Sequence, residues 1–205
     1  HNEALVLNGE QLTLISVAIN NKQLSVEQYR LSDQNLSLKT SERNFKLTIV
    51  TEINPIDNTS LEGLFKSGDA FCTQCEAEGF RRISYYLDRP DVMAVFTTKV
   101  IADKTVYPYL LSNGNKIAQG DLDNNKHFVT WHDPFPKPCY LFALVAGDFD
   151  LLTDTFTTCS NREVSLEIFV DKGNSHKSEH AMASLKKSMK WDEETFGLEY
   201  DLDIY

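Results

Sequence analysis

The chain has 205 residues, 41% of them hydrophobic and 24% charged, which is enough to bury the core of one large β domain or of one domain and part of another. Its formal net charge of −10 argues against a nucleic-acid or anionic-membrane surface, which would need clustered Lys and Arg. The acidic surface would suit cationic ligands, but a surface that serves solubility is the preferred interpretation. The longest nearly unbroken apolar run, residues 139–147, is too short to cross a bilayer, which takes roughly 20 residues.

Residues 5–53 predict an antiparallel sheet. Apolar stretches such as residues 12–19, 23–29 and 45–53 alternate with turn signals, among them Asn20-Asn21, at the spacing of short strands. The last strand should end before Pro55, because proline offers no amide hydrogen to a ladder and pushes its predecessor toward extended geometry.

The same patterning resumes after residue 92. Its strands are expected at residues 94–102, 107–111, 116–122, 127–131, 140–149 and 163–170. Residues 123–125, Asp-Asn-Asn, suit a hairpin turn because Asn and Asp tolerate positive φ. Residues 133–138 hold three prolines and predict a rigid connection outside any sheet.

Beyond Ser175 the apolar period becomes helical. The N-cap is expected at Ser178 and the end at Gly197, and four apolar residues recur at helical spacing: Met182, Leu185, Met189 and Phe196. Residues 198–205 look like the entry to another strand. Such an ending is typical of the amino-terminal part of a longer protein.

The cysteines suggest neither a disulfide scaffold nor a metal site. Cys72 and Cys75 have zinc-knuckle spacing, but Cys139 and Cys159 are single and a structural zinc needs four ligands. Buried or loop thiols in a reducing, cytoplasmic compartment are therefore expected.

A second metal-like pattern occurs at the start of the expected helix. His176, Glu179 and His180 match the H-x-x-E-H form of inverted zinc peptidases and would make the chain a small metallohydrolase. With Ser178 as the N-cap, however, His176 precedes the helix and the two imidazoles do not share a face. A solvated, charged helix start is the favoured interpretation.

The triplet Gln74-Cys75-Glu76 is a candidate binding site. In an extended segment, alternation places Gln74 and Glu76 on one face and Cys75 on the other. A carboxylate beside an amide oxygen suits an ammonium group. The alternative is a glutamate that simply faces solvent.

The run from Tyr85 to Pro90 contains paired tyrosines followed by Asp88 and Arg89. It could be an aromatic ligand platform, but a packed corner with a local ion pair is the preferred interpretation.

Four long runs carry a resemblance to a known family. They lie at residues 59–68, 76–92, 133–150 and 189–205 and read TSLEGLFKSG, EAEGFRRISYYLDRPDV, DPFPKPCYLFALVAGDFD and MKWDEETFGLEYDLDIY. Together they closely resemble the bacterial aminopeptidase N family of zinc aminopeptidases.

The resemblance implies a mainly β, antiparallel saddle-like sandwich over residues 1–150, continuing to about 172. Residues 173–205 would be the helix and strand that start a thermolysin-like catalytic domain. The family's H-E-x-x-H and G-A-M-E-N motifs do not occur in this sequence. The segment is therefore expected to hold no catalytic residue and no metal, and to be inactive alone, with zinc in the full-length enzyme.

The resemblance also implies roles for two residues. Glu76 would help to hold the α-ammonium of a peptide with a free N-terminus, and Gln74 would border the pocket for the first side chain. The implied partners are such peptides and the protein's own catalytic domain after Tyr205. A stand-alone β-sandwich that binds a peptide or a sugar is the alternative function.

Overall fold

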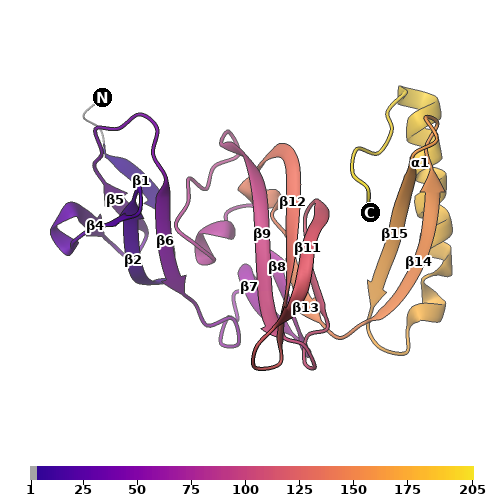
Figure 1. Cartoon of the computed structure of the whole chain (residues 1–205), viewed down its shortest axis with the longest axis horizontal. Helices are drawn as coiled ribbons and strands as arrows, with labels where there is room; N and C mark the ends of the chain where they lie inside the picture. The colour runs from indigo at the N-terminus through magenta and orange to yellow at the C-terminus, as the bar shows by residue number, and fades with distance from the viewer. Residues whose placement is uncertain (1–3) are drawn as a thin grey trace. The chain divides into compact units, whose positions relative to one another are not determined.

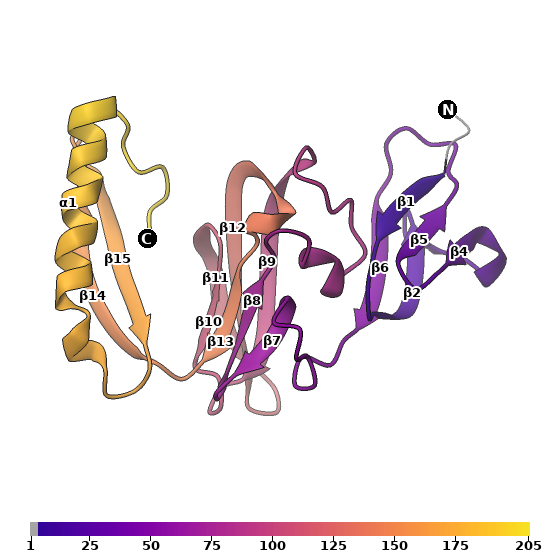
Figure 2. The ribbon, with the colours of Figure 1, turned by 180° about the vertical axis from the view of Figure 1, so that it is seen from behind.

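The computed structural model describes residues 4–205 (Figures 1 and 2). The chain divides into two compact units. Unit 1 comprises His1–Val95 and Phe135–Val145, and unit 2 comprises Phe96–Pro134 and Ala146–Tyr205. Neighbouring strands such as β1 and β5, β11 and β12, and β14 and β15 pair antiparallel, and one α-helix lies near the carboxyl end of the described chain. The mainly β fold with a single carboxyl-terminal helix is therefore confirmed.

Unit 1 begins with two three-stranded sheets. The first has the order β1-β5-β4 and the second the order β3-β2-β6. Their strands are β1 (Leu5–Asn8), β2 (Thr13–Ile19), β3 (Lys22–Gln23), β4 (Tyr29–Leu31), β5 (Asn35–Leu38) and β6 (Leu47–Glu52).

The sequence correctly predicted where two of these strands end. Asn20 and Asn21 have φ of 50° and 66° between β2 and β3, and β6 ends before Pro55, both as predicted. The stretch expected as one strand over residues 23–29 is instead interrupted by the 3-10 helix η1 (Val26–Gln28).

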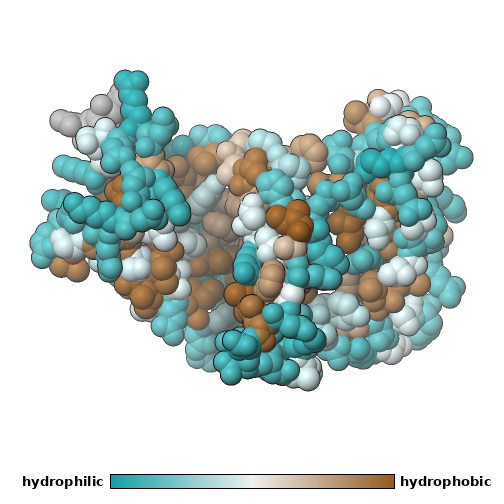
Figure 3. Space-filling view, in the orientation of Figure 1, coloured by the Kyte–Doolittle hydropathy of each residue, from teal (hydrophilic) through white to brown (hydrophobic). Residues whose placement is uncertain are grey.

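The core of these sheets is apolar. It consists of five buried residues: Leu7, Val17, Leu36, Leu38 and Tyr85. Hydrophilic residues cover much of the visible surface over the amino-terminal strands (Figure 3).

The rest of unit 1 carries the candidate site. β7 (Gly63–Ser67) and β8 (Ala70–Gln74) form an antiparallel hairpin, followed by the 3-10 helix η2 (Phe80–Arg82). Another 3-10 helix, η3 (Cys139–Leu141), leads to β13 (Leu144–Gly147), which lies beside β8.

Unit 2 contains a sheet of order β11-β12-β9. β9 (Met93–Asp103) begins in unit 1 and continues into unit 2, whereas β12 (Lys126–Pro138) begins in unit 2 and its last residues belong to unit 1. β11 (Asn115–Leu122) and β10 (Tyr109–Ser112) lie within unit 2. The predicted Asn turn joins β11 to β12, with φ of 58° at Asn124 and 59° at Asn125.

The prediction that residues 133–138 lie outside any sheet is wrong, because β12 continues to Pro138. The three prolines occupy alternate positions, 134, 136 and 138. In a strand, alternate amides point to the same edge, so the prolines forfeit donors on one edge alone. Phe135 and Lys137 keep their N–H groups for the other edge, and the proline φ is compatible with extended backbone.

The last elements of unit 2 are a β-hairpin and a helix. β14 (Asp150–Thr157) pairs with β15 (Glu163–Val170), and α1 (Glu179–Phe196) lies along them after the 3-10 helix η4 (Ser175–Lys177) (Figures 1 and 2). Four buried residues form this core: Val164, Leu166, Met182 and Met189.

The helix matches its prediction, since Ser178 is the N-cap and Gly197 ends it with φ of 64°. β15 also has its expected bounds. The strand expected over residues 140–149 is reduced to the short β13, and β14 was not predicted.

Truncating a buried leucine in β5 should destabilise the chain far more than truncating its exposed cross-strand neighbour. Leu36 is fully buried and pairs with Leu31 of β4, which is 51% exposed. Leu36→Ala is expected to cost about 2 to 5 kcal/mol of unfolding free energy because it removes apolar contacts and leaves a cavity. Chemical denaturation of both variants measures the difference. Equal midpoints for Leu36→Ala and Leu31→Ala would contradict this account of the core.

Candidate functional site

Glu76 lies in the turn that follows β8. The exposures of the triplet follow the predicted alternation, because Gln74 and Glu76 are exposed whereas Cys75 is only 2% exposed. The Gln74 side-chain amide donates from Nε2 to the backbone oxygen of Glu76 at 3.1 Å, and the Glu76–Ala77 peptide is cis. The carboxylate of Glu76 is therefore presented to solvent next to the side chain of Gln74.

The turn is closed by Gly79. Its N–H donates to the oxygen of Cys75 at 2.8 Å. A Cβ at position 79 would lie 2.4 Å from the oxygen of Gln74 and 2.8 Å from the nitrogen of Gly63, both of them backbone atoms that cannot swing away. Gly63 has φ of 72°, which a side chain would strain. Two glycines thus let the turn pack directly on the start of β7.

The buried carboxylate of Asp88 fixes the chain that follows this turn. Asp88 is 3% exposed, and its Oδ2 accepts hydrogen bonds from the backbone N–H (3.1 Å) and the Nε (2.9 Å) of Arg81. Its Oδ1 accepts from the Sγ of Cys139 at 3.0 Å. A buried charge must be paired and hydrogen-bonded to be tolerated, and Asp88 is both.

The two arginines of η2 connect this cluster to neighbouring acidic residues. Arg81 also lies 3.2 Å from Glu78 and 3.9 Å from Glu10. Arg82 pairs with Glu10 at 3.1 Å and with Glu62 at 3.2 Å. Ion pairs thus connect the segment after Glu76 to the loop between β1 and β2, which holds Glu10, and to the loop before β7, which holds Glu62.

The cysteines stay as thiols. Burial raises the pKa of Cys75 to about 12, with the Asp88 charge adding to the effect. Burial likewise raises the pKa of Cys139 to about 12, helped by its hydrogen bond to Asp88. All four cysteines are free, and Cys72 and Cys75 belong to no metal-sized group within residues 4–205. Cys75 and Cys139 are buried, and Cys159 is exposed between β14 and β15, as expected of buried or loop cysteines, whereas Cys72 is half-buried in β8.

In the described chain, one group of potential metal ligands lies within 4.8 Å: Cys159, Glu193 and Glu199. Three of its four carboxylate oxygens accept hydrogen bonds. Glu199 accepts hydrogen bonds from the Sγ of Cys159 (3.0 Å) and from the Oγ of Ser160 (2.7 Å). Side-chain hydrogen bonds, of which that from Cys159 has the largest effect, lower the pKa of Glu199 to about 2. Glu193 accepts from the N–H of Cys159 at 3.1 Å.

The H-x-x-E-H pattern is split by the helix boundary. His176 lies in η4, whereas Glu179 and His180 open α1 behind the N-cap Ser178. Over residues 4–205 these three side chains form no potential metal group. The preferred sequence interpretation, a charged helix start, therefore fits the structure.

The paired tyrosines form a packed corner, as preferred from the sequence. Tyr85 is 6% exposed within the core, and Tyr86 meets the ring of Phe80 edge to face at 5.1 Å. The expected local ion pair is wrong, however. Asp88 pairs with Arg81, whereas Arg89 pairs with Asp91 at the surface.

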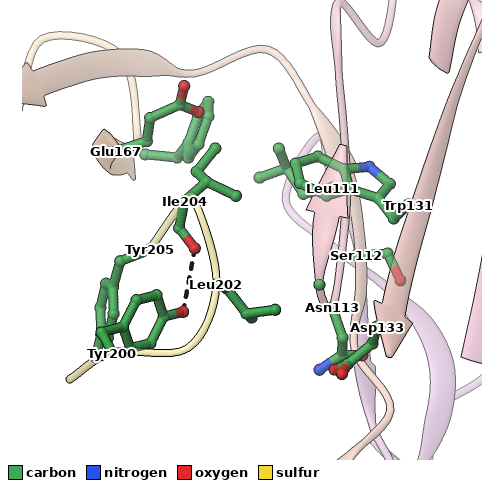
Figure 4. Close-up of a pocket in the computed structure, with 12 residues that line it drawn as sticks. Leu111, Ser112, Asn113, Trp131, Asp133, Glu167, Tyr200, Leu202, Ile204 and Tyr205 are labelled. Atoms are coloured by element: carbon green, nitrogen blue, oxygen red, sulfur yellow. Dashed lines mark hydrogen bonds between the residues drawn. The ribbon is translucent and has the colours of Figure 1, made fainter. Parts of the chain in front are cut away.

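Sequence analysis missed a cavity of about 340 Å³ in unit 2 (Figure 4). It is lined by residues of β10, β12, β15 and the carboxyl-terminal segment, and the hydroxyl of Tyr200 donates to the oxygen of Ile204 at 3.1 Å beside it. Only the pairing of distant segments creates this cavity, so no local sequence signal marks it.

Comparison with solved structures defines the class of this fold. The chain aligns over its full length with 24% of a crystal structure of Legionella pneumophila aminopeptidase A in complex with aspartic acid, at TM-score 0.94 and 39% identity. It also aligns, at TM-score 0.82 and 15% identity, with 48% of an M1 zinc metallopeptidase from Deinococcus radiodurans, a likeness that shows the fold alone. The fold is that of the β-rich amino-terminal region of such metallopeptidases.

The family follows from the sequence comparisons. Residues 1–141 match the Peptidase M1 N-terminal domain, and the chain belongs to this family. It is 64% identical to aminopeptidase N of Escherichia coli over 201 residues, which cover 98% of the chain and 23% of that relative. Aminopeptidase N of Haemophilus influenzae is 56% identical over 210 residues, all of the chain and 24% of the relative. The chain thus spans about a quarter of these relatives, and the resemblance inferred from its sequence is confirmed.

Loss of the Asp88 carboxylate should destabilise unit 1. Asp88→Ala leaves the guanidinium of Arg81 and the thiol of Cys139 without their main acceptor, and a cost on the order of 3 kcal/mol is expected. Asp91→Ala is the matched control, because it removes the same group from an exposed pair with Arg89. Denaturation midpoints compare the two variants. If Asp91→Ala lost as much stability as Asp88→Ala, the stabilising role given to the buried carboxylate of Asp88 would be refuted.

Adding one methyl group at position 79 should disturb the turn. Gly79→Ala is expected to cost about 1 to 3 kcal/mol, because its Cβ would meet fixed backbone atoms. Gly120→Ala is the control, since its Cβ would meet only the ring of Phe128, at 3.1 Å, which can shift. Thermal unfolding of both variants tests the prediction, and equal stability would show that the turn can yield.

Proposed function

We propose that this chain is the amino-terminal, substrate-anchoring part of a zinc aminopeptidase, in which Glu76 binds the α-ammonium group of a peptide. The observation that carries the proposal is the exposed side chain of Glu76, which lies beside Gln74 on a turn closed by hydrogen bonds. Family membership and the names of the relatives support the activity of the whole protein.

The chemistry of the site fits an N-terminus. A free peptide amino group is a cation with three donors, and a carboxylate supplies charge and acceptors for it. The Gln74 amide, next to Glu76, would border the pocket for the first side chain of the substrate. A turn fixed by Gly79 and by the Arg81–Asp88 pair would hold Glu76 in place before the substrate arrives, which lowers the ordering cost of binding.

Catalysis would take place in the part of the protein after Tyr205. There zinc would polarise the scissile carbonyl and activate a water molecule. The chain itself lacks the H-E-x-x-H and G-A-M-E-N strings, so residues 1–205 alone should be inactive. Glu76 is then a binding and positioning residue.

The proposed domain organisation follows the family. The β domain would cover residues 1–150 and continue to about 172, and residues 173–205 would begin the catalytic domain. A cytoplasmic location remains part of the proposal, on the basis of the free thiols. Among residues 4–205, no helix combines the length and apolar character needed to span a membrane.

The test is the substitution Glu76→Gln in the full-length protein. Loss of the charge should reduce kcat/KM for amino-acyl substrates by about 100-fold or more, since an unpaired ammonium would be left in a closed site. Glu78→Gln is the matched control, because it removes the same charge two residues away on an exposed side chain that pairs with Arg81. Its kinetics should stay near those of the unmodified enzyme.

Substrate analogues sharpen this test. If Glu76 binds the ammonium, the native enzyme should discriminate strongly against substrates whose amino group is acetylated or absent, and Glu76→Gln should lose much of that discrimination. Near-normal kinetics for Glu76→Gln, or full discrimination in that variant, would refute the anchoring role.

A further inference from the structure

Residues 139–144 contact the chain on both sides of the turn that carries Glu76. The segment runs from the start of η3 to the first residue of β13 and lies within unit 1. The turn itself leaves β8 at Gln74 and enters η2 at Phe80. One segment, remote from the turn in sequence, thus reaches the element before the turn and the element after it.

On the β8 side, Thr73 makes the contact. It directly precedes Gln74, and its Oγ1 accepts a hydrogen bond from the N–H of Leu144 (2.9 Å) and donates one to the oxygen of the same residue (3.4 Å). β13 also neighbours β8 in the sheet. The backbone of Leu144 therefore holds the chain just before the turn.

On the η2 side, Cys139 and Phe142 make the contacts. Cys139 is 1% exposed, and its Sγ donates to the Oδ1 of Asp88 at 3.0 Å. The Oδ2 of Asp88 accepts from the N–H of Arg81 at 3.1 Å. The ring of Phe142 meets that of Phe80 edge to face, with 5.2 Å between the ring centroids. The thiol thus helps to orient the carboxylate that holds η2, and the phenyl ring packs against the first residue of η2.

With both ends held, the turn has little room to move. The N–H of Gly79 donates to the oxygen of Cys75 at 2.8 Å. The Nε2 of Gln74 donates to the backbone oxygen of Glu76 at 3.1 Å. A shift of residues 139–144 would move one end of this closed turn relative to the other, and the exposed side chain of Glu76 with them.

We propose that residues 139–144 are a positioning segment for substrate binding: they hold the Glu76 carboxylate where it meets the α-ammonium group of a peptide. The inference rests on the role proposed for Glu76. Cys139 and Thr73, which take part in the two contacts, act through Glu76 and touch no substrate themselves. A group displaced by about 1 Å can lower the rate by up to about 100-fold, so a loosened turn should be visible in the kinetics.

Substitution of Cys139 in the full-length protein tests the η2 side. Cys139→Ala removes the donor to Asp88 and should lower kcat/KM for amino-acyl substrates by about 10-fold. Cys139→Ser keeps a donor at this position and should restore most of that loss. Cys72→Ala is the control and should leave the kinetics unchanged, because it removes a thiol of β8 whose pKa is raised by burial alone, without a hydrogen bond.

Substitution of Thr73 tests the β8 side and does not depend on whether Cys139→Ala folds. Thr73→Val keeps the shape of the side chain but lacks the hydroxyl that binds Leu144, so kcat/KM should again fall by about 10-fold. Thr73→Ser keeps the hydroxyl and should behave like the native enzyme. Chemical denaturation establishes that each assayed variant is folded. Native kcat/KM in Thr73→Val, or in a folded Cys139→Ala, would overturn the proposal.

A double-mutant cycle distinguishes positioning from a general loss of structure. If the segment acts through Glu76, adding Thr73→Val to Glu76→Gln should change kcat/KM by less than about 2-fold, because the group that is positioned has already lost its charge. The same holds for Cys139→Ala. Full, multiplicative losses in the Glu76→Gln background would show that the segment does not act through Glu76.

The same assays separate this inference from the proposed function. Near-normal kinetics for Glu76→Gln would refute the proposed function itself. A strongly impaired Glu76→Gln beside native kinetics for Thr73→Val and Cys139→Ala would refute the positioning segment alone.

Discussion

The buried carboxylate of Asp88 is the constraint on which the candidate site depends. It binds Arg81 of η2 and Cys139 of η3, and its own N–H donates to the Oδ1 of Asn8 in β1 at 3.3 Å. Three segments distant from one another in sequence therefore meet at one residue, Asp88. Because an unpaired charge in this position would be costly, the arrangement that satisfies Asp88 is strongly favoured over its alternatives.

Glu76 shows the opposite use of the same functional group. Asp88 is buried and fully engaged, whereas Glu76, twelve positions earlier, is exposed on a turn whose backbone is fixed at Gly79. A binding carboxylate has to remain available to its ligand and yet be held in place, and the structural one nearby provides much of that support. Stability and proposed recognition are thus divided between two acidic side chains of one stretch.

Local chemistry explains what the sequence could predict. The caps of α1 at Ser178 and Gly197, the turn at Asn124-Asn125 and the alternation around Cys75 all rest on neighbouring residues. The partners that create the site could not be found in this way. Arg81 and Asp88 are close in sequence, but Asp88 was expected to pair with its neighbour, and only the buried corner selects the other arginine.

Contacts between distant segments account for the remaining differences. The fit of Gly79 against Gly63 depends on how the turn packs on β7, and the cavity in unit 2 on where residues 200–205 lie against β15. β14 was missed although β15, its partner, was predicted with the correct bounds. The composition and the apolar pattern of β14 mark it only weakly as a strand, and its pairing with β15 is what identifies it.

The prolines of β12 have a consequence for behaviour in concentrated solution. Residues 134, 136 and 138 give one side of the strand a continuous stretch without N–H donors. A foreign strand approaching that side would find carbonyl groups but nothing to complete a ladder. An unpaired strand edge is a template for aggregation, and a stretch without donors would discourage a foreign strand from pairing along this side.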